Sequence, residues 1–239
     1  LAGQSITITG IAKGAGMIKP NMATMLAYVA TDAQISATRL QTLVSTAAEC
    51  SFNRITVDGD TSTNDAAMLV ATGASDLDID GLSAEEQTRF ELALIEVFIS
   101  LAQQVIRDGE GATKFVTVRV TGGGDSAECL AVAYTVAESP LVKTALFASD
   151  PNWGRILAAI GRAGIADLNV DAIQVYLDDV LIAENGGRAD SYTEQLGQSV
   201  MSQEEITIEI RLNRGEARET VWTTDFSHEY VTINAEYRT

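Results

Sequence analysis

A capped helix with a regular apolar stripe is the strongest constraint on what this chain can fold into. Ser83 and Glu86 stand three residues apart, as in a capping box, where each side chain binds the backbone N–H of the other residue. Beyond them, apolar residues recur at helical spacing: Phe90, Leu94, Val97, Phe98, Leu101 and Val105. Arg107 suits the last turn and Gly109 the residue after the end. The sequence therefore predicts a long amphipathic helix that buries one face.

Shorter segments on both sides of this helix alternate between strand and helix patterns. Period-two alternation or a short apolar run predicts strands over residues 4–9, 24–30, 54–57, 114–121, 206–212, 217–224 and 230–234, and a hairpin over 172–182. Helical spacing with capping residues predicts helices over residues 37–50, 64–72, 125–138 and 153–162. The strand at 24–30 carries no charge, so we expect both of its faces to be buried. This order predicts a mixed α/β fold in which helices cover the sheets.

Composition limits the class of protein. The 239 residues, 46% of them hydrophobic and 21% charged, suffice for one core or two lobes of a globular protein. If there are two lobes, Gly122–Gly124 is the expected division, although a tight connection is the favoured interpretation of three glycines. No apolar stretch reaches the roughly 18 residues that span a bilayer. The start at Leu1 has neither a methionine nor a basic region, so we expect the interior of a longer polypeptide rather than a signal peptide.

The net charge of −17 argues against two classes of partner. Nothing forms the basic stripe that neutralises nucleic-acid phosphates, and an acidic surface is repelled by anionic membranes. Cys50 and Cys129 lie far apart and outside any C-x-x-C pair, so neither a disulfide framework nor a zinc site is indicated. We expect two buried, reduced thiols in a cytoplasmic protein.

A glycine-rich segment with one lysine precedes the junction Ala23-Thr24, at which an apolar run begins. A threonine hydroxyl is a poor nucleophile unless a base lies beside it. Cleavage of the peptide bond before Thr24 would supply that base, because a free α-amino group has a pKa of about 7.7–8. We therefore predict cleavage between Ala23 and Thr24, with Thr24 acting afterwards as an N-terminal nucleophile.

Five blocks carry a resemblance to a known family: KGAGMIKPNMATMLAYVATDA, NRITVDGDTSTNDAAMLVATG, RDGEGATKF, SDPNWGRI and INAEYRT. In this order they resemble the bifunctional ornithine acetyltransferases, also called glutamate N-acetyltransferases, of arginine biosynthesis. The resemblance runs from the first residues to the last. It implies a four-layer αββα sandwich, which is similar to that of the N-terminal-nucleophile hydrolases but is connected differently.

The same resemblance implies an activity and a set of site residues. The acetyl group of N2-acetylornithine would pass to glutamate through an acetyl ester on Thr24. Residues at the family's substrate-binding positions are Lys13, Thr24, Glu110, Asn234 and Thr239. Lys13 would pair with a substrate carboxylate, whereas Glu110 would hold the substrate ammonium or move a proton, two roles that the sequence leaves open.

Partners also follow from the resemblance. Residues 1–23 would be the C-terminal tail of an α chain, and residues 24–239 a β chain. The N-terminal portion of the same precursor would supply the oxyanion hole, and two copies of each chain would form an α2β2 heterotetramer. The reaction needs no metal or prosthetic group, and acetyl-CoA is an alternative acetyl donor.

Other interpretations stay open at this point. A hydrolase of similar fold, such as an amidohydrolase or aminopeptidase with an N-terminal nucleophile, would use water as the acceptor. A non-catalytic acidic binding module would form no acetyl adduct. The loop at residues 58–63 lacks the glycine and glutamate of a calcium loop, so we expect it to cap the helix predicted after it. His228 is the one histidine, which disfavours a Ser-His-Asp triad.

Overall fold

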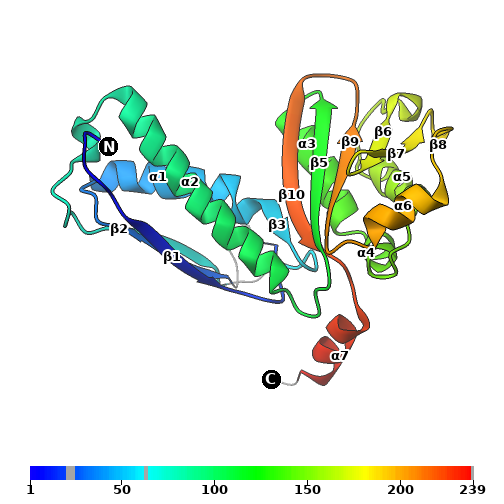
Figure 1. Ribbon diagram of the computed structural model, residues 1–239, viewed down its shortest axis with the longest axis horizontal. Coiled ribbons are helices and arrows are strands. Elements are labelled where there is room, and N and C mark those ends of the chain that lie inside the picture. Colours follow the sequence, from blue (N-terminus) through cyan, green and yellow to red (C-terminus); the bar gives the residue numbers. More distant parts are fainter. Residues whose placement is uncertain (20–24, 62–63, 238–239) are drawn as a thin grey trace. The chain divides into compact units, whose positions relative to one another are not determined.

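A computed structural model describes the chain apart from residues 20–24, 62–63 and 238–239 (Figure 1). The chain divides into two compact units. The first consists of residues 1–55 and 59–108, and the second of residues 56–58 and 109–239. Gly122–Gly124 lie inside the second unit, at the end of a strand.

The first unit is a three-stranded sheet with two helices. Its strands, in the order β1-β2-β4, are β1 (Ile8–Lys13), β2 (Leu26–Thr31) and β4 (Ala66–Ala71). β1 pairs with β2 antiparallel, and β4 pairs with β2 parallel. The helices are α1 (Ala37–Cys50) and α2 (Ala84–Arg107), with short 3₁₀ turns η1 (Phe52–Arg54) and η2 (Ile79–Gly81).

The long helix α2 confirms the capping-box prediction. The Ser83 hydroxyl accepts a hydrogen bond from the Glu86 backbone N–H at 3.3 Å and donates one to the Glu86 carboxylate at 3.0 Å. The apolar stripe is buried, and Phe98 packs edge-on against Phe52 with ring centroids 5.7 Å apart. A Cβ on Gly10 would lie 2.9 Å from a Leu101 methyl carbon, so this glycine lets β1 approach the helix closely.

Two predictions about strands of the first unit need correction. The strand predicted over residues 4–9 starts only at Ile8 and continues to Lys13, because it pairs along the whole of β2. The described part of strand 24–30 is confirmed, but its burial on both faces is wrong. Ala27 and Val29 are buried, whereas Tyr28 is 45% exposed.

The helix predicted over residues 64–72 is also wrong, since this segment forms β4. Its alanines, methionine and leucine favour a helix locally, but hydrogen bonds to β2 along the register Leu26↔Ala66 to Thr31↔Ala71 override that propensity. The next described element after the loop at residues 58–63 is the strand β4 and not a helix, so the capping role predicted for this loop is wrong as well.

The second unit contains a seven-stranded sheet in the order β3-β10-β5-β9-β6-β7-β8. Its strands are β3 (Ile55–Thr56), where the chain passes between the units, β5 (Phe115–Gly123), β6 (Gln174–Leu177), β7 (Val180–Glu184), β8 (Gly187–Arg188), β9 (Glu205–Arg211) and β10 (Ala217–Thr224). Its helices are α3 (Ser126–Ala137), α4 (Pro140–Phe147), α5 (Trp153–Gly161), α6 (Glu194–Met201) and α7 (His228–Glu236), with a 3₁₀ turn η3 (Val170–Ala172).

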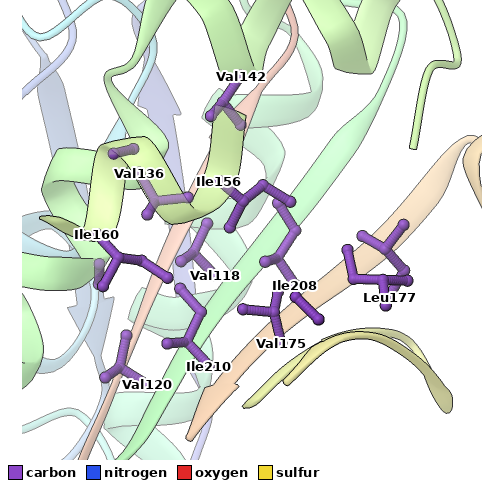
Figure 2. Close-up of a cluster of buried hydrophobic side chains, with 14 of the residues drawn as sticks. Val118, Val120, Val136, Val142, Ile156, Ile160, Val175, Leu177, Ile208 and Ile210 are labelled. Atoms are coloured by element: carbon purple, nitrogen blue, oxygen red, sulfur yellow. The ribbon is translucent and has the colours of Figure 1, made fainter. Parts of the chain in front are cut away.

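Period-two alternation explains the core of this unit (Figure 2). On the parallel neighbours β5 and β9, every second side chain is a buried valine or isoleucine, such as Val118 and Ile208. These pack against apolar side chains of the helices, among them Val136 and Ile156. The opposite face of the same strands is polar and carries the ion pair of Arg119 with Glu209 at 3.6 Å.

Most elements of the second unit agree with the prediction. The helices at 125–138 and 153–162, the hairpin at 172–182 and the strands at 114–121, 206–212 and 217–224 are confirmed within a few residues. The turn at Asn213–Gly215 does not close a hairpin, because β5 lies between β9 and β10. The sequence patterns did not indicate α4 or α6.

The strand predicted over residues 230–234 is wrong, because this segment belongs to helix α7. The Ser227 hydroxyl caps it by accepting a hydrogen bond from the Tyr230 backbone N–H at 3.3 Å. Valine, isoleucine and threonine within the segment mimic a strand pattern. The cap stabilises the helix, since it satisfies one of the backbone N–H groups at the start of α7.

The two cysteines differ in exposure. Cys129 is buried in α3, and burial raises the pKa of its thiol. Cys50 is exposed at the end of α1, so its predicted burial is wrong. Across the part of the chain that the structure describes, no helix combines the length and the apolar character that a membrane span requires.

Candidate active site

Lys13 lies next to the start of the strand that follows Thr24. It is the last residue of β1 and pairs with Leu26, the first residue of β2. Its side chain is exposed. Ala23 and Thr24, the predicted cleavage site and nucleophile, lie outside the described residues, and so does Thr239. Leu26 follows Thr24 by two positions in the sequence, so the β1–β2 ladder places Lys13 beside the strand that follows the predicted nucleophile.

The loop before β4 holds the described residues on both sides of positions 20–24. The Asp65 carboxylate accepts a hydrogen bond from the Met25 backbone N–H, and the Ala66 N–H donates to the Met25 carbonyl at 2.9 Å. The Thr61 hydroxyl donates to the Lys19 carbonyl at 3.1 Å. Sequence reasoning missed Asp65 and Thr61, although the run of small polar residues that carries them marked a loop with many hydrogen-bonding groups.

Glu110 and Asn234, two of the predicted site residues, are in contact. The Asn234 side-chain amide donates a hydrogen bond to the Glu110 carboxylate at 2.8 Å and a second one to the Tyr230 carbonyl at 3.0 Å. Glu110 lies in the loop after α2, and Asn234 lies in α7. The chain thus brings together two predicted site residues from distant parts of the second unit.

Gly111 makes this approach possible. Its φ of +66° lies in the left-handed region, and an added Cβ would lie 2.5 Å from the Tyr230 nitrogen. The Ser227 hydroxyl donates a hydrogen bond to the Gly111 carbonyl at 2.6 Å. The loop and α7 therefore touch through backbone atoms, and any side chain at position 111 would separate them.

Tyr230 contacts a second carboxylate at this end of the second unit, that of Asp58. Its hydroxyl donates a hydrogen bond to Asp58 at 3.4 Å. Its ring stacks on Phe226, with centroids 4.6 Å apart and an interplanar angle of 17°. Asp58 had been assigned a capping role, and sequence reasoning did not connect it with Tyr230, since 172 positions separate them.

Two further predicted features have structural roles. Asn152, in the Asp-Pro-Asn-Trp signature, caps α5 by accepting a hydrogen bond from the Arg155 N–H at 3.1 Å. The Arg155 guanidinium donates to the Leu141 carbonyl at 2.8 Å. His228 opens α7 and packs edge-on against Phe147, with centroids 5.3 Å apart. The described residues contain no cluster of three or more His, Cys, Asp or Glu side chains suited to a metal ion.

This combination of a mixed α/β fold, a lysine beside the β2 start and a Glu110–Asn234 pair agrees with one family. The ArgJ family matches residues 1–239, and the chain belongs to it. Similar curated proteins are named "Arginine biosynthesis bifunctional protein ArgJ". Those of Pseudomonas fluorescens (strain Pf0-1) and Psychrobacter arcticus are 63% and 61% identical, over 99% and 100% of this chain. The chain spans 59% of the length of each relative.

A solved structure supports the same assignment. The crystal structure of the arginine biosynthesis bifunctional protein argJ from Bacillus halodurans is 37% identical, with a TM-score of 0.83. The match covers 90% of this chain and 100% of the solved chain. The predicted family and the predicted mixed α/β class with sheets layered against helices are therefore confirmed.

Proposed function

We propose that the complete protein transfers an acetyl group from N2-acetylornithine to glutamate, which gives ornithine and N-acetylglutamate. The observation that carries the proposal is the match to the ArgJ family over the whole chain, with relatives named as bifunctional arginine biosynthesis proteins. The meeting of Glu110 and Asn234 supports it, since the family's positions for substrate binding are occupied and adjacent.

The reaction takes two steps through one ester. The Thr24 hydroxyl attacks the acetyl carbonyl while its own α-amino group accepts the hydroxyl proton. The bond from the carbonyl carbon to nitrogen breaks, and ornithine leaves with that proton on its amine. The α-amine of glutamate then attacks the acetyl ester, and N-acetylglutamate departs as the Thr24 oxygen regains a proton.

The remaining residues bind the amino-acid substrates. An ammonium such as that of Lys13 attracts the α-carboxylate as a compact point charge. Asn234 holds the Glu110 carboxylate, which in turn binds the substrate ammonium or assists proton movement. Thr239 completes the binding set. No metal or prosthetic group takes part, and acetyl-CoA is the alternative acetyl donor to test.

Cleavage before Thr24 creates the nucleophile. In support, the whole of the solved chain from Bacillus halodurans aligns with 90% of this chain. The segment from Thr24 to the C-terminus also makes up about nine tenths of the sequence. The portion that the longer relatives have in addition supplies the oxyanion hole as a partner chain, and the cleaved chains assemble as an α2β2 heterotetramer in the cytoplasm.

N-terminal sequencing of the purified complete protein tests cleavage, and intact-mass measurement with N2-acetylornithine tests acylation. We expect a chain that begins with Thr24 and an acetyl adduct on its first peptide. Acetate release that does not depend on glutamate would favour the amidohydrolase instead. A protein that is uncleaved and forms no adduct would favour the acidic binding module.

A further inference from the structure

A buried carboxylate joins the two segments that carry Glu110 and Asn234. Asp225 is 1% exposed and precedes α7. Its Oδ1 accepts hydrogen bonds from the backbone N–H groups of Thr113 at 2.9 Å and Lys114 at 3.0 Å. Its Oδ2 accepts one from the Thr113 hydroxyl at 2.5 Å. Thr113 follows Glu110 by three positions, so these bonds attach the Glu110 loop to the chain that enters α7.

A buried lysine lies beside this carboxylate. Lys143, in α4, is fully buried, and its ammonium donates hydrogen bonds to the Thr223 hydroxyl at 2.8 Å and to the Thr224 carbonyl. The ammonium also lies 4.7 Å from the centre of the Phe226 ring. Lys143 therefore contacts the chain on both sides of Asp225: Thr223 and Thr224 before it, and Phe226 after it.

Aromatic stacking connects this segment to helix α7. The Phe226 ring stacks on the Tyr230 ring, and the Tyr230 carbonyl accepts a hydrogen bond from the Asn234 side-chain amide. The chain from Asp225 to Asn234 is thus held at its start by hydrogen bonds and in its middle by stacking. Since α7 buries none of its residues, its position depends on these contacts, on those of Ser227 and Gly111, and on the packing of His228 against Phe147.

We propose that Asp225 is a positioning residue of the substrate site, which holds the Glu110 loop and helix α7 together so that Glu110 and Asn234 meet, with Lys143 supporting the adjoining chain through its hydrogen bonds. This inference rests on the proposed function, because the two residues are taken to bind substrate. Asp225 acts through the Glu110 loop and α7.

Two pairs of variants of the complete protein separate positioning from general stability. Thr113→Val removes one hydrogen bond to Asp225 and keeps the shape, whereas Thr113→Ser keeps the hydroxyl. Asp225→Ala removes the whole set. Asp225→Asn keeps Oδ1 for the two N–H groups and presents an amide to the Thr113 hydroxyl. Asp178→Asn is a control in the same sheet, since Asp178 accepts a hydrogen bond from the Thr207 N–H at 2.8 Å, outside both segments.

We expect Asp225→Ala to raise the KM for N2-acetylornithine by about tenfold, a loss of roughly 1.4 kcal/mol. Thr113→Val should raise this KM by about threefold, while Thr113→Ser, Asp225→Asn and the Asp178 control stay near the wild-type value. Amide hydrogen exchange of α7 should quicken in the first two variants and not in the others. Cleavage before Thr24 should be unaffected in all of them.

Wild-type KM together with wild-type exchange of α7 in both Thr113→Val and Asp225→Ala would overturn the inference. Equal effects of Thr113→Val and Thr113→Ser would also overturn the inference, because only the serine variant keeps a hydroxyl that can donate a hydrogen bond to Asp225. Failure of the proposed function is recognised separately, as a wild-type protein that neither cleaves nor transfers acetyl groups. The exchange measurement decides the positioning role even then.

Discussion

The side-chain amide of Asn234 lies 2.8 Å from the Glu110 carboxylate, although 124 positions separate the two residues. An amide that donates to a carboxylate leaves the other carboxylate oxygen available for a cationic group. The pair is therefore suited to hold a charged substrate in one orientation.

Asn234→Asp should weaken substrate binding more than Asn234→Ala. A second carboxylate against Glu110 replaces the hydrogen bond by repulsion between like charges. We expect the KM for N2-acetylornithine to rise about tenfold or more for the aspartate, and by less for the alanine. Steady-state kinetics against pH measure both. Equal KM values for the two variants would contradict an electrostatic role for the pair.

Gly111→Ala should destabilise the second unit strongly. A Cβ at this position meets the Tyr230 nitrogen at 2.5 Å and also needs a φ of +66°. Gly164→Ala is the matched control, because Gly164 has a φ of +76° with nothing within 4 Å. We expect about 1 kcal/mol for the control from backbone strain alone, and about 3 kcal/mol or more for Gly111→Ala. Urea unfolding measures both values, and similar losses would refute the close approach.

Lys143→Met should change how stability depends on pH. Burial lowers the pKa of Lys143 from 10.5 to about 7, against the opposing charges of Asp225, Asp58 and Glu138. Between about pH 7 and about pH 10, the unfolded chain binds this proton and the folded chain does not, so the stability of the wild type rises with pH. The methionine variant lacks this rise.

We expect the difference in unfolding free energy between the wild type and Lys143→Met to shift towards the wild type by at most about 1.4 kcal/mol per pH unit across that window. Urea unfolding at several pH values gives this slope. A difference that is constant with pH would show that Lys143 keeps its charge in the folded protein.

Asp65→Ala should slow cleavage between Ala23 and Thr24. Its carboxylate binds the N–H of Met25, the residue directly after the proposed nucleophile, so its loss frees the backbone there. We expect at least a tenfold slower cleavage, because small misplacements of reacting groups cost large factors in rate. Gel analysis of freshly translated precursor follows the reaction. Asp76→Asn, at an exposed turn of the same unit, is the control and should cleave at the wild-type rate.

Sequence patterns predicted those elements whose local signals agree with their surroundings. In α2, the Ser83 cap, the apolar stripe and the glycine after the end all indicate the same helix. In β4, the local preference of Ala66–Ala71 for a helix is overridden by pairing with β2. In α7, strand-like residues form a helix because Ser227 caps it and because Gly111 meets its first turn.

The residues around the candidate site also fall into those that the sequence indicated and those that it did not. Lys13, Glu110 and Asn234 were identified through their sequence blocks, and the structure gives the last two a mutual contact. Asp65 lies in one of these blocks but was not singled out, and Asp225 lies outside all of them. Their roles depend on backbone groups 40 and more than 110 positions away, and no local pattern encodes those distances.

The order of strands in the larger sheet also bears on how the protein is made. Among the described strands, β10 comes last in the sequence, yet it lies between β3 and β5. Until residues 217–224 have emerged, one edge of β5 has no neighbour and the sheet is split at that point. Nascent chains in which residues 217–224 have not yet emerged should therefore be sensitive to proteases, and pairing of β10 with β5 should close the sheet.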